Sequence, residues 1–332
     1  MKVNLRNRHL LTLEDFDKEE IAFLIELAAE LKKAKHNGKE VQKLKNKNIA
    51  LVFEKPSTRT RSAFEVAAHD QGANITYLEA ISSHIGLKES MEDTARVLGR
   101  YYDGIGFRGF KQESVEILAK YSGAVVWNGL TDTKHPTQAI ADLMTIKEKI
   151  KKPLEKVIIT YVGDGRANTS NSLLLISSIF GIKFRIVSPK LLYPNRELLD
   201  TAKKIAEKSG SSIELTDNIL KGVRGSDVIY TDIWVSMGEE HLIGERILLL
   251  KEYQVDMDMI KATENPDVLF LHPLPSFHDI NTKIGMEVFH KFGLKSMEVT
   301  DEVFRSKHSV VFDEAENKLH TIKAIMIATL GN

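Results

Sequence analysis

The feature that most constrains the fold of this chain is a set of short apolar runs, each bounded by polar residues. Runs of this kind are typical of buried strands in parallel sheets. They occupy residues 49–53, 157–162, 184–187, 227–230 and 268–271. Stretches with helical periodicity, such as residues 171–180 and 196–207, lie between most of them. Because strands that alternate with helices form mainly parallel sheets, the sequence predicts an α/β fold.

Helix signals stand at both ends of the chain. Asp17, with Glu20 three residues later, forms a capping-box pattern at the start of an apolar-periodic stretch. Gly38 lies just past that stretch, where a glycine that ends a helix is expected. Residues 320–330 are rich in Ile, Ala and Met and predict a terminal helix.

The length of the chain favours two domains. It has 332 residues, and a domain typically takes about 150. The stretch 148–153 is polar and basic and precedes the strand predicted at 157–162, so we expect the boundary there. The predicted domains therefore meet near residue 150.

Composition excludes several classes of function. The 46 basic and 46 acidic side chains cancel, so nothing indicates a nucleic-acid partner. The chain has no cysteine, which excludes disulfides, thiolate zinc sites and cysteine nucleophiles. No apolar run reaches the length of a membrane helix, and the N-terminal residues lack a secretory signal pattern, so a cytoplasmic protein is expected.

The loop Ser-Thr-Arg-Thr-Arg at residues 57–61 is the first candidate site. It follows the strand predicted at 49–53 and opens a helix. Hydroxyl groups, free backbone N–H groups and arginines at a helix N-terminus can together surround a phosphate. The alternative is a capped helix that carries two surface arginines.

Two further loops follow predicted strands. His135 and Gln138 stand in His-Pro-Thr-Gln, after a further apolar run at residues 125–128, and can hydrogen-bond a small planar group, although a lone histidine is more often structural. The loop Gly-Asp-Gly-Arg-Ala-Asn at 163–168 lacks the third glycine of a dinucleotide fingerprint. No acidic residue ends the next strand, where Ser188 stands, which argues against a nicotinamide cofactor. Asn168 remains a plausible polar site.

The last two loops supply groups for an amine and a carboxylate. Asp232 can hold an amine, and Ser236 can hold a carboxylate or else cap a helix. In His-Pro-Leu-Pro at 272–275, Pro273 offers its backbone carbonyl as a rigid acceptor. Because ligands bind where loops leave the carboxyl ends of strands, all these loops predict one cleft. Histidines and carboxylates show no metal-ligand spacing along the chain, so no metal site is predicted.

The order of these motifs resembles that of the aspartate/ornithine carbamoyltransferase family. The motifs that carry the resemblance are residues 57–61, 135–138, Asp232 with Ser-Met-Gly at 236–238, and 272–275. The similarity runs from Leu10 to Leu330, and residues 89–100 and 298–304 look like the ornithine branch outside the sites as well. Ser-Met-Gly is the most specific signature, because the aspartate branch has a basic loop there.

The resemblance implies a two-domain transferase of arginine metabolism. Residues 1–150, completed by a C-terminal helix at 318–332, would form a Rossmann-like carbamoyl-phosphate-binding domain, and residues 151–317 an ornithine-binding domain. It also implies a homotrimer, or a multiple of trimers, with active sites between protomers. The implied reaction converts carbamoyl phosphate and L-ornithine to L-citrulline and phosphate by direct attack of the δ-amine, without metal or cofactor.

The resemblance implies roles for residues around carbamoyl phosphate. The groups expected to bind its phosphate are Ser57, Thr58, Arg59 and Thr60. Arg108 would bridge the phosphate and the carbonyl oxygen, and His135 and Gln138 would hold the carbamoyl group. His84 would reach in from a neighbouring protomer.

A second set of residues would hold ornithine. The groups expected at its amino-acid end are Asn168, Asp232, Ser236 and Met237. The backbone carbonyls of Pro273 and Leu274 would accept from the carbamoyl nitrogen. Thr60, Arg108 and His135 would stabilise the negative charge of the tetrahedral intermediate.

Three positions depart from the pattern of the ornithine branch. Pro273 stands where that branch usually has cysteine, although the aspartate branch has proline. Lys318 stands where an arginine usually touches the carbamoyl group, and lysine lacks the planar fork of arginine. Ala167 replaces an asparagine beside Asn168. A transcarbamylase for another amine and a non-catalytic relative therefore remain alternatives, as does either direction of the reaction.

Overall fold

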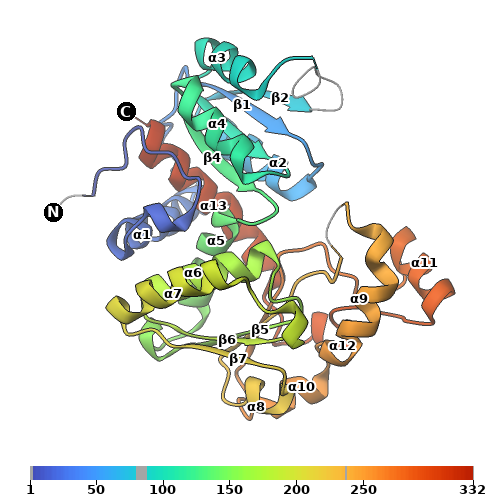
Figure 1. Ribbon diagram of the computed structural model, residues 1–332. Helices are drawn as coiled ribbons and strands as arrows, with labels where there is room; N and C mark the ends of the chain where they lie inside the picture. The colour runs from blue at the N-terminus through green and yellow to red at the C-terminus, as the bar shows by residue number, and fades with distance from the viewer. Residues whose placement is uncertain (1–2, 80–87, 236–237, 332) are drawn as a thin grey trace. The chain divides into compact units, whose positions relative to one another are not determined.

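The computed structural model describes residues 3–79, 88–235 and 238–331, which form two compact units (Figure 1). The first unit is Met1–Met144 with Ala315–Asn332, and the second is Thr145–Glu314. The division falls within helices α5 (Pro136–Lys149) and α13 (Val311–Leu330), whereas the sequence places it at residues 150 and 318. Each unit is built on a parallel sheet flanked by helices, which confirms the predicted α/β class.

The first unit has a four-stranded parallel sheet in the order β2-β1-β3-β4. Its strands are β1 (Asn48–Phe53), β2 (Asn74–Glu79), β3 (Gly104–Arg108) and β4 (Val125–Leu130). Besides α5 and α13, its helices are α1 (Lys18–His36), α2 (Thr58–Asp70), α3 (Met91–Tyr101) and α4 (Gln112–Ser122). Because β1 and β3 are neighbours, the loops that leave their carboxyl ends lie side by side.

Helix α1 begins as the capping box predicts. Asp17 accepts from the backbone N–H of Glu20, and the Glu20 carboxylate accepts from the backbone N–H of Asp17. The helix ends at His36, Asn37 is its C-cap residue, and Gly38 follows with φ +63°. Within the same unit α13 lies beside α1, and the Lys32 Nζ donates to Asn317 Oδ1 at 2.7 Å (Figure 1).

The second unit has a five-stranded parallel sheet in the order β7-β6-β5-β8-β9. Its strands are β5 (Ile158–Val162), β6 (Lys183–Val187), β7 (Ile213–Thr216), β8 (Val228–Tyr230) and β9 (Leu269–Leu271). Its helices are α6 (Asn168–Phe180), α7 (Arg196–Ser209), α8 (Ile219–Val223), α9 (Ile243–Leu250), α10 (Met257–Ala262), α11 (Lys283–Phe292) and α12 (Asp301–Phe304). The chain reverses its strand order between β5 and β8, so the loops after these two strands face a common crevice.

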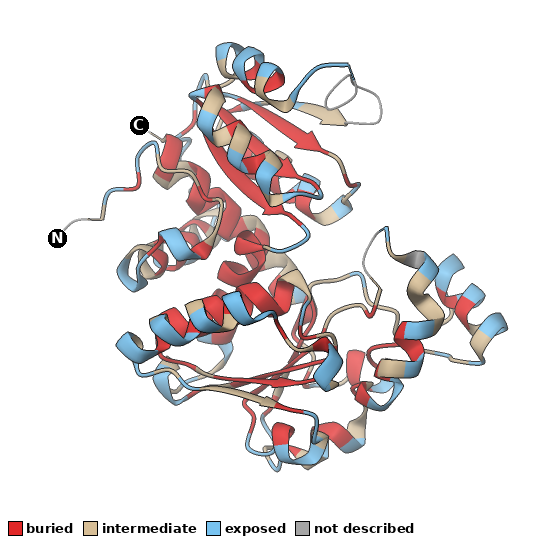
Figure 2. Ribbon diagram, viewed as in Figure 1, coloured by how far each residue is buried: buried red, intermediate tan, exposed pale blue. Residues whose placement is uncertain are grey.

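Figure 2 shows that the central strands of both sheets are buried, whereas the edge strands β2 and β7 are only partly so. Helix α6 is buried along almost its whole length, including the polar residues 169–172 of its first turns as well as the apolar residues 173–176 that follow. Over the residues that the structure describes, no helix combines the length and apolarity needed to cross a membrane.

Candidate functional site

The loop at residues 57–61 forms the N-terminus of α2. Ser57 is its N-cap, and the Ser57 Oγ accepts from the backbone N–H of Thr60 at 3.1 Å. Thr58 is exposed, Arg59 is partly buried and Thr60 is buried. Burial lowers the pKa of the Arg59 guanidinium. The remaining free N–H groups and the positive end of the helix dipole give this loop the electrostatics of an anion site.

Arg108 ends β3 directly beside that loop. It is paired in register with Phe53, the last residue of β1, and only 8% of it is exposed. Its Nη1 donates to the Thr60 Oγ1 at 3.3 Å. The structure therefore brings together Arg108 and Thr60, to which the family resemblance gives the same substrate.

His135, Gln138 and Lys318 form a buried polar cluster in the first unit. His135 precedes α5, Gln138 lies in its first turn, and Lys318 lies on α13. The Lys318 Nζ lies 3.3 Å from His135 Nε2 and donates to Gln138 Oε1 at 2.9 Å. The Gln138 Nε2 donates to Asp142 Oδ1 at 2.8 Å, one turn further along the helix. This bond fixes the orientation of the amide, so that its oxygen faces the ammonium group.

The electrostatics of this cluster keep His135 neutral. Burial lowers the pKa of His135 well below its usual value, and the charges of Lys318 and Arg108 lower it further. Because an ammonium group can only donate, the His135 Nε2 must act as the acceptor, which leaves the proton on Nδ1. The first unit therefore offers a guanidinium, an ammonium and a neutral imidazole, a set suited to polarise a carbonyl group.

In the second unit, Asp232 follows β8 and faces the start of α6. Its Oδ2 accepts from the Thr169 hydroxyl at 2.7 Å, and its Oδ1 accepts from the backbone N–H of Ile233 at 2.7 Å. Burial raises the pKa of Asp232, and the nearby His272 and these two hydrogen bonds partly oppose that rise. Asn168 is the first residue of α6, and its Oδ1 lies 3.2 Å from Thr169 Oγ1. A carboxylate held in this way can pair with an ammonium group.

Ala167 occupies the N-cap of α6, where no side chain caps the helix. Asparagine at an N-cap typically stabilises a helix by about 1 kcal/mol relative to alanine. The departure at this position therefore removes a cap as well as a polar group.

Pro273 and Leu274 follow β9 in a loop held by buried polar residues. Leu274 has φ +50°, and its backbone N–H donates to His272 Nδ1 at 3.0 Å. The other ring nitrogen of His272 lies 3.2 Å from Glu298 Oε1, and the His272 backbone N–H donates to Glu314 Oε2 at 2.9 Å. His272 and Glu298 are fully buried. The backbone of this loop is thus fixed by contacts that do not involve the side chain at position 273.

Several of these supporting residues were not among the predicted site residues. Asp142, Thr169, Glu298 and Glu314 carry no motif of their own. Asp142 could have been found from its position four residues after Gln138 on one helical face. Three predicted site residues, His84, Ser236 and Met237, lie outside the residues that the structure describes.

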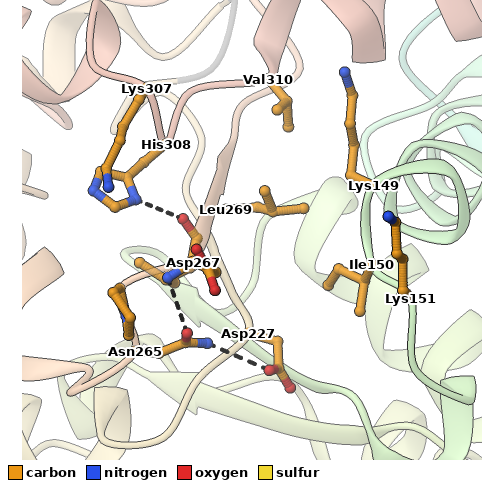
Figure 3. A pocket seen from close by; sticks show the side chains of 12 residues that line it. Lys149, Ile150, Lys151, Asp227, Asn265, Asp267, Leu269, Lys307, His308 and Val310 are labelled. Atoms are coloured by element: carbon orange, nitrogen blue, oxygen red, sulfur yellow. Dashed lines mark hydrogen bonds between the residues drawn. The ribbon is translucent and has the colours of Figure 1, made fainter.

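A cavity of about 750 Å³ lies at the opposite edge of the second sheet (Figure 3). Asp227 and Val268, which line it, directly precede β8 and β9, whereas Asp232 and Pro273 follow these strands. Lys149 and Lys151 stand on one side and Lys307 and His308 on the other. None of the predicted site residues that the structure describes lines this cavity. Since α/β proteins bind ligands at the carboxyl ends of their strands, it is not the predicted cleft.

The described residues include two groups of side chains that are close enough to share a metal ion. They are His36, Glu316 and His320 in the first unit, and His278, Asp279 and Asp301 in the second. Sequence spacing did not reveal the first group, because the fold brings its histidines together from the two ends of the chain.

Comparison with known families matches almost the whole chain. Residues 8–148 match the carbamoyl-P binding domain of aspartate/ornithine carbamoyltransferase, and residues 155–329 match its Asp/Orn binding domain. A protein of Limosilactobacillus reuteri named ornithine carbamoyltransferase is 59% identical over 332 residues, covering 100% of this chain and 99% of the relative. A protein of Streptococcus agalactiae named ornithine carbamoyltransferase 1, catabolic, is 58% identical over 330 residues, covering 99% of each.

Solved structures give the same result. Ornithine carbamoyltransferase from Pyrococcus furiosus is 40% identical with a TM-score of 0.90, covering 99% of this chain and 98% of that one. The anabolic ornithine carbamoyltransferase from Campylobacter jejuni is 36% identical with a TM-score of 0.84, covering 96% of this chain and 97% of that one.

Proposed function

This chain belongs to the aspartate/ornithine carbamoyltransferase family, and we propose that it transfers the carbamoyl group of carbamoyl phosphate to the δ-amine of L-ornithine. The products are L-citrulline and phosphate. Ornithine as acceptor rests on the names of relatives that are similar over the full chain. The observation that carries the carbamoyl phosphate part is the Thr60–Arg108 contact at the anion-binding start of α2.

Carbamoyl phosphate is bound by the first unit. The start of α2, with Ser57, Thr58, Arg59 and Thr60, holds the phosphate through backbone N–H groups, hydroxyls and the guanidinium. Arg108 reaches both the phosphate and the carbonyl oxygen. His135, Gln138 and Lys318 hold the carbamoyl group, with the Lys318 ammonium in the role that arginine has elsewhere in the family.

Ornithine is bound by the second unit. Asp232 and Asn168 hold its amino-acid end, together with Ser236 and Met237 of the family signature. The carbonyls of Pro273 and Leu274 accept from the carbamoyl nitrogen. This role needs only the backbone, so proline at position 273 is compatible with it.

The reaction is a direct attack of the neutral δ-amine on the carbonyl carbon. A C–N bond forms, and negative charge develops on the carbonyl oxygen, where Arg108 and Lys318 stabilise it together with Thr60 and His135. The C–O bond to phosphate then breaks, and the leaving phosphate takes the proton from the attacking nitrogen. Alignment of the two substrates accounts for much of the acceleration.

The assembly and location follow from the same proposal. We expect a homotrimer, or a multiple of trimers, in the cytoplasm, with His84 reaching the site of a neighbouring protomer. Analytical ultracentrifugation of the purified protein tests the assembly, and a mass that is not a multiple of three chains would contradict it.

Citrulline formation from carbamoyl phosphate and ornithine tests the function. Purified protein should form citrulline, and Arg59→Ala should lose most of the turnover. Putrescine, lysine and aspartate serve as competing acceptors in the same assay. If one of these amines gives a higher kcat/KM than ornithine, that amine is the acceptor instead. Binding of carbamoyl phosphate without turnover of any amine would indicate a non-catalytic relative. The reverse assay, citrulline with phosphate, determines which direction is faster.

A further inference from the structure

Three side chains from α1 and α13 converge in the first unit, outside the site described above. His36 is the last residue of α1, and Glu316 and His320 lie one turn apart on α13. The Nε2 of His36 lies 2.8 Å from Glu316 Oε1, and the Nε2 of His320 lies 3.5 Å from the same oxygen. One donor atom from each of the three residues lies within 4.8 Å of the others.

These separations are close to those of a metal-bound set. In a tetrahedral zinc site with bonds of about 2.0–2.1 Å, neighbouring donor atoms lie roughly 3.3 Å apart. The two observed separations lie on either side of that value, and the third, between the two histidines, is no more than 4.8 Å, so modest side-chain rotations would form the site. Two imidazoles and one carboxylate are ligands that Zn²⁺ accepts, and a water can complete the tetrahedron.

The ring of His320 is buried and only partly satisfied. His320 is 1% exposed, and its Nδ1 has no hydrogen-bond partner among the residues described. Hydrogen bonding within the protein therefore does not fully account for this buried ring.

The second group of potential ligands already has a cation. Arg305 Nε lies 2.8 Å from Asp301 Oδ1, and its Nη2 lies 3.7 Å from Asp279 Oδ2. In the first group, the nearby Lys32 Nζ is 3.9 Å from Glu316 Oε2 and is bonded to Asn317. The Glu316 Oε1, on which both histidines converge, is thus turned away from that cation.

We propose that His36, Glu316 and His320 form a binding site for a borderline divalent transition metal, represented by Zn²⁺. The ion would link the C-terminal end of α1 to α13. It would fix the turn of α13 that also carries Lys318, which contacts His135 and Gln138. This proposal does not depend on the acceptor of the reaction.

Calorimetric titration of the full-length, tag-free protein with ZnCl₂ tests the proposal. The protein is first stripped of metal and kept in phosphate-free buffer. We expect one Zn²⁺ per chain and at least a tenfold weaker affinity in His36→Ala and in Glu316→Gln. His290→Ala, an exposed histidine on α11, and His278→Ala, from the second group, should bind as the unmodified protein does. Absence of binding, equal binding by His36→Ala, or loss of binding in His278→Ala would overturn the proposal.

A second pair of variants separates metal binding from the His36–Glu316 hydrogen bond. His36→Cys keeps a zinc ligand, whereas His36→Asn keeps a hydrogen-bonding group that binds zinc poorly. Only the cysteine variant should retain tight binding. Because a ligand that binds the folded state raises the unfolding temperature, ZnCl₂ should stabilise the unmodified protein and His36→Cys but not His36→Asn. Equal stabilisation of both variants would contradict the site. His36 is exposed, so these changes should not prevent folding.

Discussion

Replacing Thr169 by valine should weaken ornithine binding and leave carbamoyl phosphate binding unchanged. The Thr169 hydroxyl donates to Asp232 Oδ2 at 2.7 Å, and its side chain is buried. Valine has nearly the same shape but no donor, so the variant should fold while Asp232 loses this hydrogen bond. Thr169 would thus act as a positioning residue for the carboxylate that we assign to ornithine.

The expected size of the effect follows from the contact. A hydrogen bond to a charged group contributes about 1.5–3 kcal/mol, and the lower end applies because Asp232 is only partly buried. About 1.5 kcal/mol corresponds to roughly a tenfold rise in the KM for ornithine. Burial already raises the pKa of Asp232, and the Thr169 hydrogen bond opposes that rise. Removing it raises the pKa further, so the acidic limb of kcat/KM for ornithine should move to higher pH.

The assay compares steady-state KM values for each substrate across this acidic limb in the unmodified protein, Thr169→Val and Thr169→Ser. Serine keeps the hydroxyl and is the matched control, so its KM and pH profile should stay close to those of the unmodified protein. An unchanged ornithine KM in Thr169→Val would refute the argument. So would the same rise in Thr169→Ser, because the methyl group and not the hydroxyl would then be responsible.

Three more predictions concern the first unit. Lys318→Met should lower kcat/KM about 100-fold because the oxyanion loses a charged donor, whereas Lys318→Arg should retain most activity in the citrulline assay. Since the pKa of His135 is lowered well below 6.5 on folding, the unfolded chain takes up its proton first, and stability should fall below pH 6.5 by up to about 1.4 kcal/mol per pH unit. In urea unfolding, the free energy of unfolding should fall less on acidification in His135→Asn than in the unmodified protein. An equal fall in both would contradict this. Lys323 is fully buried and pairs with Glu40 and Asp70. Lys323→Met should therefore lower the free energy of unfolding, measured with urea, by about 3 kcal/mol, and adding Glu40→Gln should restore part of that loss.

The strands that the sequence predicts are those buried on both faces. Residues 49–53 and 184–187 form β1 and β6 with shifts of a single residue. The strands that it misses have other compositions. β2 and β7 are edge strands with partly exposed, mixed sequences. β3 contains Gly104, where an added Cβ would lie 2.4 Å from the Trp127 ring, so packing requires a residue with low strand propensity.

The candidate site could be predicted where one loop holds all of its chemistry. The start of α2 is an example, because Ser57, the arginines and the helix follow one another in the sequence. The contact of Lys318 with His135 joins residues 183 positions apart, and the tie between Glu314 and His272 joins residues 42 positions apart. Single-sequence periodicity carries no information on such pairs, since they depend on how helices pack on the sheet.

The three departures from the ornithine branch differ in what they change. At position 273 the loop backbone is fixed by the contacts of His272 with Glu298 and Glu314, so the carbonyls keep their place without a cysteine side chain. At position 318 the ammonium contacts both groups that we assign to the carbamoyl moiety, so the charge is kept although the planar fork is lost. At position 167 the polar side chain is lost together with the α6 cap, close to Asp232 and Thr169. Of the three positions, we therefore expect position 167, at the start of α6, to have the largest effect on which amine the protein accepts.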